Sequence, residues 1–190
     1  MGDFDTAWLD LRESYARRAL NTDVLNAIAG WAKAHGWPLR IVDLGCGTGA
    51  SFRHLHEFLP SVSRWTSVDG DHNLLDHAVA RTGATPLRCN LVSGLSFIPF
   101  NSFDLVTASA FIDLVSEAWL NRLIDVVIKN GCALWLPMTA TEKREWSPAD
   151  EADEKLTAQF NDHMKSDKGF GPALGGNAAG YAEQKLTAAG

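Results

Sequence analysis

The sequence has few cysteines, no long apolar run and no cluster of positive charge. Its three cysteines, Cys46, Cys89 and Cys132, are odd in number and lack the spacing of metal ligands, so they imply neither zinc nor disulfides. No apolar stretch approaches the length of a membrane span, and the N-terminus has no basic region followed by an apolar core. We therefore expect a cytoplasmic protein without a metal site or a membrane partner.

The charge of the chain disfavours a nucleic-acid partner. The sequence has 17 Lys and Arg against 23 Asp and Glu, a formal net charge of −6, and its basic residues form no run. A surface that binds a phosphate backbone normally gathers basic side chains, and this sequence shows no such gathering. At 190 residues and 46% hydrophobic content, the chain is long enough for one globular domain with a sizeable core.

Three glycines at alternate positions, Gly45, Gly47 and Gly49, directly follow the strand-like stretch 41–44. Glycine is needed where a strand turns sharply into a helix, because a side chain would keep the backbone away from a ligand above the helix N-terminus. The spacing also fits the dinucleotide pattern Gly-x-Gly-x-x-Ala that begins at residue 45, with Asp69 at the distance of a ribose-binding acid. The sequence therefore predicts a nucleoside site.

Asp43 and the third glycine make this stretch resemble motif I of the class I S-adenosylmethionine-dependent methyltransferases. The segment 95–106, in which Pro-Phe precedes Phe-Asp-Leu-Val, resembles that family's approach to its fourth strand, and the whole resemblance spans roughly residues 39–137. It implies S-adenosylmethionine as cofactor and methyl transfer as activity. The cofactor-binding residues that it implies are Asp43, Gly45, Cys46, Gly47, Gly49, Asp69, Gly70, Asn90, Leu91 and Ser109.

The resemblance also suggests roles for two of these side chains. Asp69, at the end of a predicted strand, is expected to accept hydrogen bonds from both ribose hydroxyls. Asn90 stands where the family usually has an aspartate that reaches the adenine amino group, and its carbonyl oxygen can accept the same bond. Asp71 is better suited to cap the following helix than to bind ligand.

The alternation of predicted strands and helices indicates a Rossmann-like α/β fold, with a mostly parallel sheet and helices on both faces. Strands are expected at 39–44, 64–69, 85–89, near 106 and at 132–137. The family's sheet normally has seven strands, so the last strands are missing from this count. We favour truncation of a longer protein as the reason, and an uncovered edge at 132–137 could then pair with a second copy to form a homodimer.

We expect a single methyltransferase-like domain in three parts: a helical cap at 1–36, a cofactor-binding core at 37–138, and a lid with C-terminal helices at 139–190. The glycine-rich stretch 168–176 is either part of that lid or an ordinary connection.

Periodicity and capping signals define the helices outside the core. Trp8, Leu11 and Tyr15 recur at helical spacing and are expected to share one packed face. The next helix is expected to begin at Thr22 or Asp23 and to end at Gly36. A later one is expected to start at Ser147 and Pro148 and to run to about residue 165, with Leu156 and Phe160 packed inward.

The methyl acceptor is expected to be a small molecule. Residues 139–168 carry eight acids and five bases, and this net negative charge repels polyanions. The loop 109–115 also lacks the two prolines and aromatic residue common in enzymes that methylate amino groups of nucleic-acid bases. Asp113 in that loop is a candidate catalytic base, or the first residue of a turn. The candidate substrate contacts are Tyr15, Trp146, Asn161 and His163, each of which has a plain packing or surface role as its alternative.

Two other functions fit the glycine pattern. An NAD(P)-dependent oxidoreductase would use the same loop for its dinucleotide. A member of the methyltransferase fold without catalytic activity would bind the cofactor or a partner protein only.

Overall fold

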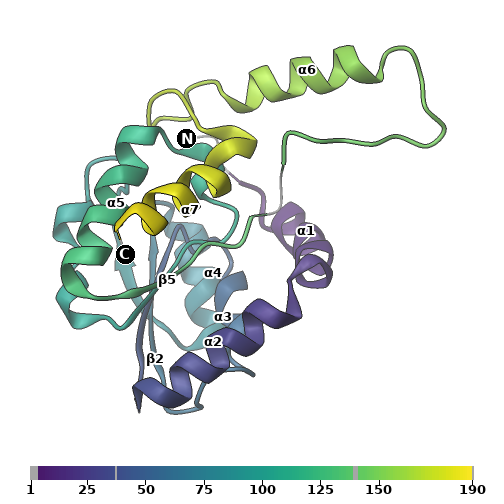
Figure 1. Cartoon of the computed structure of the whole chain (residues 1–190). Helices are drawn as coiled ribbons and strands as arrows, with labels where there is room; N and C mark the ends of the chain where they lie inside the picture. Colours follow the sequence, from purple (N-terminus) through teal and green to yellow (C-terminus); the bar gives the residue numbers. More distant parts are fainter. Residues whose placement is uncertain (1–3, 37, 139–140, 190) are drawn as a thin grey trace.

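In the computed structural model of the chain, residues 4–36, 38–138 and 141–189 are described. They contain one parallel five-stranded sheet with strand order β3-β2-β1-β4-β5 (Figure 1). The strands are β1 (Arg40–Leu44), β2 (Arg64–Asp69), β3 (Thr85–Arg88), β4 (Leu105–Thr107) and β5 (Ala133–Trp135). The order reverses between β1 and β4, and ligands of open α/β sheets bind at such a switch point.

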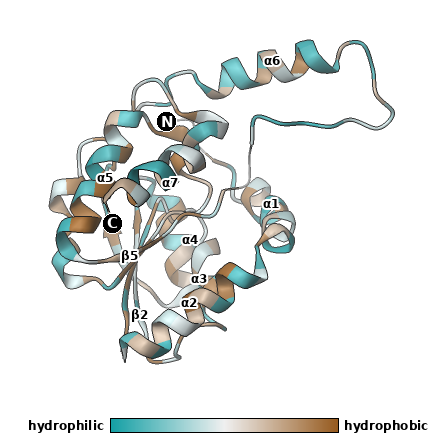
Figure 2. Ribbon diagram, in the orientation of Figure 1, coloured by the Kyte–Doolittle hydropathy of each residue, from teal (hydrophilic) through white to brown (hydrophobic). Residues whose placement is uncertain are grey.

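The two central strands are buried on both faces, as parallel strands between helical layers must be. Alternate residues of β1 point to opposite sides, so that Val42 joins one apolar cluster and Ile41 the other. The first cluster includes residues of α5 (Glu117–Asn130) and α7 (Ala178–Ala189), and the second includes residues of α2 (Thr22–His35) and α3 (Ala50–Leu55). Helices on both faces of a parallel sheet are thus confirmed, and Figure 2 shows the apolar residues gathered along the sheet.

Side-chain caps begin four of the described helices, and Asp5 is the cap of α1 (Thr6–Ala19). Asp71 accepts hydrogen bonds from two backbone N–H groups of α4 (His72–Thr82), as predicted. Ser116 caps α5. α2 begins at Thr22 and Gly36 ends it, as predicted, but its N-cap is Asn21 and not Thr22 or Asp23.

The predicted packing of the first helix is wrong. α1 (Thr6–Ala19) contains no buried residue, and Trp8, Leu11 and Tyr15 are 47%, 65% and 64% exposed. The opposite face of the helix turns toward the domain, because its acidic residues form ion pairs with arginines of α3 and α4. Ion pairing, not apolar packing, therefore sets the orientation of α1.

The predicted start of the late helix is also wrong. α6 runs from Asp153 to Met164, and Ser147 and Pro148 precede it in an extended segment. This segment and α6 form an arm, residues 141–164, that stands away from the sheet (Figure 1). Leu156 and Phe160 are exposed instead of packed inward, and Arg144 stacks on the Phe160 ring at 3.8 Å.

The predicted boundaries of the three parts fall at residues 37 and 139, which lie outside the described residues, as do both chain ends. Within the described part, η1 (Leu95–Phe97), η2 (Phe100–Ser102), η3 (Ile112–Leu114) and η4 (Gly175–Asn177) are short 3-10 turns. No helix of that part is long and apolar enough to cross a membrane.

Candidate active site

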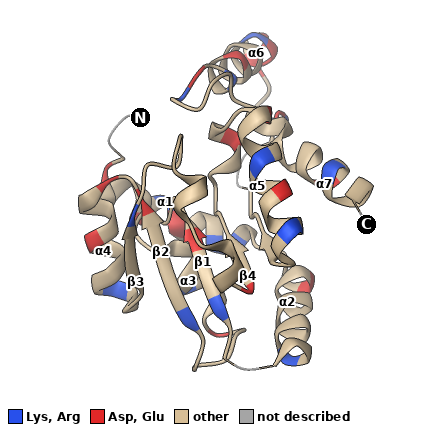
Figure 3. Ribbon diagram, turned by 90° about the vertical axis from the view of Figure 1, so that its left-hand side faces the viewer, with Lys and Arg blue, Asp and Glu red and all other residues tan. Residues whose placement is uncertain are grey.

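A cavity of about 1050 Å³ lies at the carboxyl ends of the central strands. Its floor is the turn after β1, its walls include Asp69 at the end of β2 and Ser109 after β4, and α1 covers it. Figure 3 shows acidic residues at the upper, carboxyl ends of β1 and β2 and basic residues at their opposite ends. The cavity therefore opens where the fold places ligands.

The glycine-rich turn leaves bare backbone on the cavity floor. Gly45 has φ +63°, and a Cβ there would lie 2.6 Å from the ring of Phe111. Gly49, with φ +89°, occupies the left-handed conformation that precedes α3. Both positions need glycine, so the tight turn that the sequence predicted is confirmed.

Asp69 is held in place by the backbone around it. Its Oδ2 accepts a hydrogen bond from the N–H of Gly47 at 3.0 Å, and its Oδ1 accepts one from Asp71 at 2.9 Å. Burial raises the pKa of Asp69, whereas these backbone N–H groups lower it. Each carboxylate oxygen keeps a lone pair, so the side chain can still accept ligand hydroxyls.

The loop after β3 forms another wall of the cavity. Asn90 lines the cavity, and its side-chain oxygen accepts a hydrogen bond from the N–H of Val92 at 3.0 Å. The carbonyl of Leu91 accepts one from the ring N–H of buried Trp119 at 2.6 Å. The loop is thereby fixed from both its side chain and its backbone, with the Asn90 amide N–H₂ left for a ligand.

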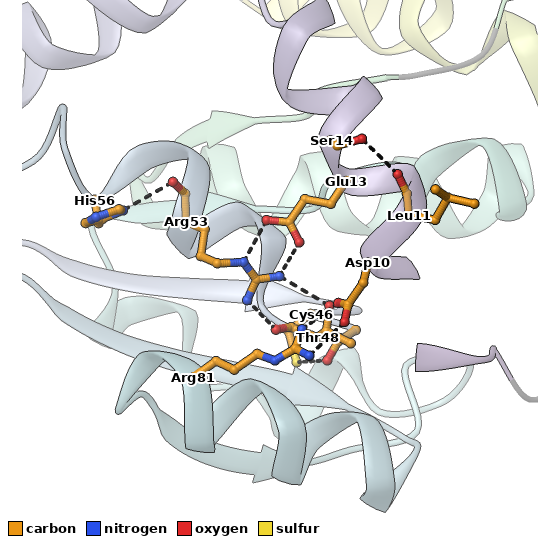
Figure 4. A network of polar contacts seen from close by, with 10 residues as sticks. Asp10, Leu11, Glu13, Ser14, Cys46, Thr48, Arg53, His56 and Arg81 are labelled. Carbon is orange, nitrogen blue, oxygen red and sulfur yellow. Dashed lines mark hydrogen bonds and ion pairs between the residues drawn. The ribbon is translucent and has the colours of Figure 1, made fainter. Parts of the chain in front are cut away.

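Two ion pairs tie α1 over this floor (Figure 4). Arg53 of α3 donates to both carboxylate oxygens of Glu13, through Nε at 2.6 Å, and to the carbonyl of Thr48 at 2.7 Å. Arg81 of α4 donates to both oxygens of Asp10 at 2.5 and 2.8 Å. α1 forms the roof of the cavity. Since this helix buries no residue, the two ion pairs are its main attachment to the domain.

Eight of the ten predicted cofactor residues line the cavity, and two do not. Asp43 lies beneath the turn, 1% exposed, where its Oδ1 accepts a hydrogen bond from Thr107 Oγ1 at 2.7 Å. Burial raises its pKa to about 7. Gly49 shapes the turn from outside the cavity. The residues that line it are Gly45, Cys46, Gly47, Asp69, Gly70, Asn90, Leu91 and Ser109.

The candidate base Asp113 lies behind the cavity wall. It is 8% exposed and sits in η3, between Phe111 and Leu114, which do line the cavity. Burial raises its pKa and the charge of Arg12 lowers it. Its Oδ1 has no hydrogen-bond partner among the described residues.

The structure does not bring the four candidate substrate residues together. Tyr15 is on the outer face of α1, and Trp146, Asn161 and His163 belong to the arm. Asn161 accepts from Arg144 and donates to the carbonyl of Glu142, which is a structural role at the base of the arm. None of the four lines the cavity.

Sequence reasoning missed several residues of the cavity. Leu9, Arg12, Glu13 and Ala16 line it from α1 and follow helical spacing, so the same periodicity, read for the polar face, would have found them. His54 carried no such signal. It lines the cavity at 4% exposure, and neither of its ring nitrogens has a partner among the described residues.

The glycine-rich stretch 168–176 contributes to the cavity. Gly169 and Phe170 line it, and the Phe170 ring packs edge-on against Phe111 at 5.5 Å and Trp119 at 5.6 Å. Phe170 is 7% exposed, which makes this part of the stretch a wall rather than a surface connection.

Comparison with known proteins shows what these features resemble. A family model described as a methyltransferase domain matches residues 41–131. An S-adenosylmethionine-dependent methyltransferase from Mesorhizobium loti shares 25% identity and a TM-score of 0.52, covering 87% of this chain and 82% of that one. The plantazolicin methyltransferase BpumL, in complex with a triazolic desmethylPZN analog and SAH, shares the fold with a TM-score of 0.51 at 14% identity, over 85% of this chain and 66% of its own. No curated protein sequence matches significantly.

The matched residues contain the glycine-rich turn, the strand that ends at Asp69 and the loop of Asn90. The wider fold agrees with the structure from Mesorhizobium loti over most of both chains. Residues 41–131 thus match the methyltransferase domain, and the chain is similar in fold to S-adenosylmethionine-dependent methyltransferases, so the cofactor that these matches indicate is S-adenosylmethionine.

Proposed function

We propose that this protein transfers the methyl group of S-adenosylmethionine to a small-molecule acceptor bound in the same cavity. The observation that carries the proposal is the shared lining: Asp69, the glycine-rich turn and the roof helix all face one space of about 1050 Å³. Ligand pockets typically measure roughly 300 to 1,000 Å³, so this space is large enough for a nucleoside cofactor together with a small second molecule.

The residues present fit the cofactor. Asp69 is fixed by two backbone N–H groups with lone pairs left for the ribose hydroxyls. The bare backbone at Gly45 and Gly47 allows close approach of the amino-acid end above the start of α3. Asn90 and the backbone of Leu91 would border the adenine.

The bound cofactor supplies an electrophilic methyl group on its sulfonium. The protein's task is then to align a nucleophile behind that carbon and to exclude water, and proximity supplies most of the rate. α1 and Phe170 close the cavity from two sides and are suited to the exclusion of water. A general base would add a smaller factor.

Asp113 remains a proposed base, and its buried position makes the proposal testable. As a group behind the wall, it would need a shift of η3 to reach the acceptor. Asp113→Asn should lower the rate and remove an ionisation from the pH profile if Asp113 takes the proton. An unchanged rate and pH profile would exclude that role.

The small size of the acceptor is supported by the charge of the segment that leads to the cavity. Between residues 141 and 168 acids outnumber bases by eight to five, and this segment leads directly to Gly169 and Phe170 at the cavity wall. A polyanion would approach against that field, whereas a small neutral molecule would not.

Two experiments test the proposed function. Titration with S-adenosylhomocysteine and with NAD separates the methyltransferase from the oxidoreductase, and binding of NAD alone would refute the proposal. Tyr181 and Lys185 have the Tyr-x-x-x-Lys spacing of short-chain dehydrogenases, but α7, which carries them, does not line the cavity. Incubation with tritiated cofactor and separate RNA, protein and low-molecular-weight fractions then identifies the acceptor class. Label confined to the macromolecules would refute the small-molecule acceptor, and no label in any fraction would favour a catalytically inactive binder.

Pairing of two copies along β5 stays a proposal as well. Among the described strands β5 pairs with β4 alone, and Leu134 and Leu136 beside the outer edge are only partly buried. Sedimentation velocity over a wide concentration range measures it, and a monomer throughout would contradict it.

A further inference from the structure

Two arginines line the cavity without a partner among the described residues, and of these Arg12 is partly buried whereas Arg88 is exposed. Arg12 lines the cavity from α1, half-buried, and it forms no hydrogen bond or ion pair within the part of the chain that the structure describes. Its guanidinium lies 5.2 Å from the centre of the Trp8 ring. The neighbouring Arg53 and Arg81, in contrast, each bind a carboxylate of the same helix through two nitrogen atoms.

The surroundings of Arg12 leave its charge only partly balanced. Burial lowers the pKa of Arg12, and the negative charge of Asp113 raises it without a direct ion pair between them. Asp113 Oδ1 also has no partner. A cation that is withdrawn from water without a hydrogen-bonded counter-ion is costly, so an anion bound beside Arg12 would be favoured.

The position of Arg12 selects the part of the ligand that it can reach. Leu9, one turn earlier on the same helix, lies directly over the glycine-rich turn. A Cβ atom added to Gly47 would be 3.6 Å from Leu9 Cδ1. On the other side Arg12 is close enough to Asp113 of η3 to shift its pKa. Arg12 therefore lies near the space between the glycine-rich turn and η3.

The remaining charge in the cavity makes this position selective for an anion. Glu13, Asp69, Asp71 and Asp76 line the cavity and would repel a negative group near them, and Arg88, the other unpaired arginine of the lining among the described residues, is exposed to solvent. A guanidinium presents parallel N–H groups that match the two oxygens of a carboxylate.

We propose that Arg12 binds a carboxylate group of a ligand held between the glycine-rich turn and η3. This inference rests on the proposed methyl transfer and extends it. The carboxylate belongs either to the amino-acid end of the cofactor or to the methyl acceptor, and in the second case the acceptor is a carboxylic acid.

The first experiment compares the binding of two adenosine ligands. S-adenosylhomocysteine carries the amino-acid carboxylate, and 5′-methylthioadenosine lacks it. If the cofactor is the source, Arg12→Gln should weaken S-adenosylhomocysteine about 10- to 100-fold, the range for a charge-assisted pair, and leave 5′-methylthioadenosine unchanged. Arg12→Lys should recover part of the loss. Arg18→Gln, on the exposed face of the same helix, is the matched control and should change neither affinity.

The second experiment tests whether the carboxylate belongs to the methyl acceptor. With the protein saturated by S-adenosylhomocysteine, sodium benzoate should shift the NMR signal of the Arg12 side-chain N–H, and the neutral isostere benzamide should not. Arg12→Gln identifies that signal by its loss, and its melting temperature checks that the variant is folded.

The outcomes separate this inference from the proposed function. If Arg12→Gln leaves both adenosine affinities unchanged and benzoate produces no shift, Arg12 binds no carboxylate and the inference is wrong. If neither adenosine ligand binds the wild-type protein, the proposed function fails, and the benzoate titration of the protein alone still tests Arg12.

Discussion

The attachment of α1 by ion pairs leads to a prediction about how the cavity opens. Glu13→Gln keeps the shape of the side chain but removes its charge, so that Arg53 loses its counter-ion while its hydrogen bonds to Thr48 remain. Because α1 buries no residue, we expect this single change to loosen the helix while the sheet and α5 remain folded.

The magnitude follows from the exposure of the two ion pairs. The side chains of Arg53 and Glu13 are 24% and 17% exposed, and a hydrogen bond to a charged group at such a site is worth about 1.5–3 kcal/mol. Part of this is recovered by the amide, so Glu13→Gln should cost about 1–2 kcal/mol of α1 docking, a 5- to 30-fold increase in opening. The pair between Arg81 and Asp10 is more exposed, and Asp10→Asn should cost about 0.2–1 kcal/mol.

Hydrogen exchange measured by mass spectrometry can follow α1 and α5 separately. In Glu13→Gln, the amides of α1 should exchange 5- to 30-fold faster while those of α5 keep their rate. Arg17→Gln is the control, because its contact with Glu57 is 3.6 Å long and highly exposed. Added salt should speed α1 exchange in the wild type more than in Glu13→Gln. Unchanged α1 exchange, or equal acceleration of α5, would refute the argument that ion pairs hold the roof.

Three further substitutions test the floor of the cavity. Asp69→Ala should weaken S-adenosylhomocysteine by about 1.5–3 kcal/mol in calorimetric titration, and an unchanged affinity would show that Asp69 does not bind the ribose. Gly45→Ala should lower the free energy of unfolding by at least about 1–2 kcal/mol, the cost of the left-handed conformation, with the clash against Phe111 added; a stability equal to wild type in urea titration would contradict this. The folded-state pKa of Asp43 is raised from 3.8 to about 7, so its contribution to stability is complete below pH 3.8 and is lost as the pH rises through 7. That gap corresponds to about 4 kcal/mol, and Asp43→Asn should remove this decline from unfolding free energies measured between pH 4 and pH 8.

The sheet and its glycine-rich turn could be predicted because local signals and the tertiary structure agree there. Stretch 41–44 is apolar around one buried acid, and the glycines after it occupy conformations that other residues rarely adopt. Asp69 could be predicted as the ribose-binding acid from its distance after the glycines and from its place at the end of a strand. These features depend on a few adjacent residues, which is why one sequence was enough to find them.

The roof could not be predicted in the same way, because its orientation depends on residues far apart in the sequence. On α1 the exposed Trp8, Leu11 and Tyr15 gave the stronger apolar pattern, yet Glu13 finds its partner 40 positions later, at Arg53. Hydrophobic periodicity carries no information about such pairs.

The arm was mispredicted for a related reason. Ser147 and Pro148 are good helix-start residues, but α6 begins only at Asp153, and Leu156 and Phe160 on it have no apolar surface of the domain against them. A capping signal indicates where a helix can begin, while packing decides whether it does.

An aromatic cluster explains why opening should involve the roof and not the floor. Phe111 packs beside Gly45, Trp119 donates its ring N–H to the carbonyl of Leu91, and Phe170 closes against both aromatic rings. The glycine-rich turn, the adenine-side loop and the glycine-rich wall are therefore held by one buried unit, whose separation would expose large apolar side chains to water. Release of α1 breaks the two close ion pairs and the long, exposed one between Arg17 and Glu57, and it exposes little apolar surface. Movement of α1 is therefore the less costly way for cofactor and acceptor to enter.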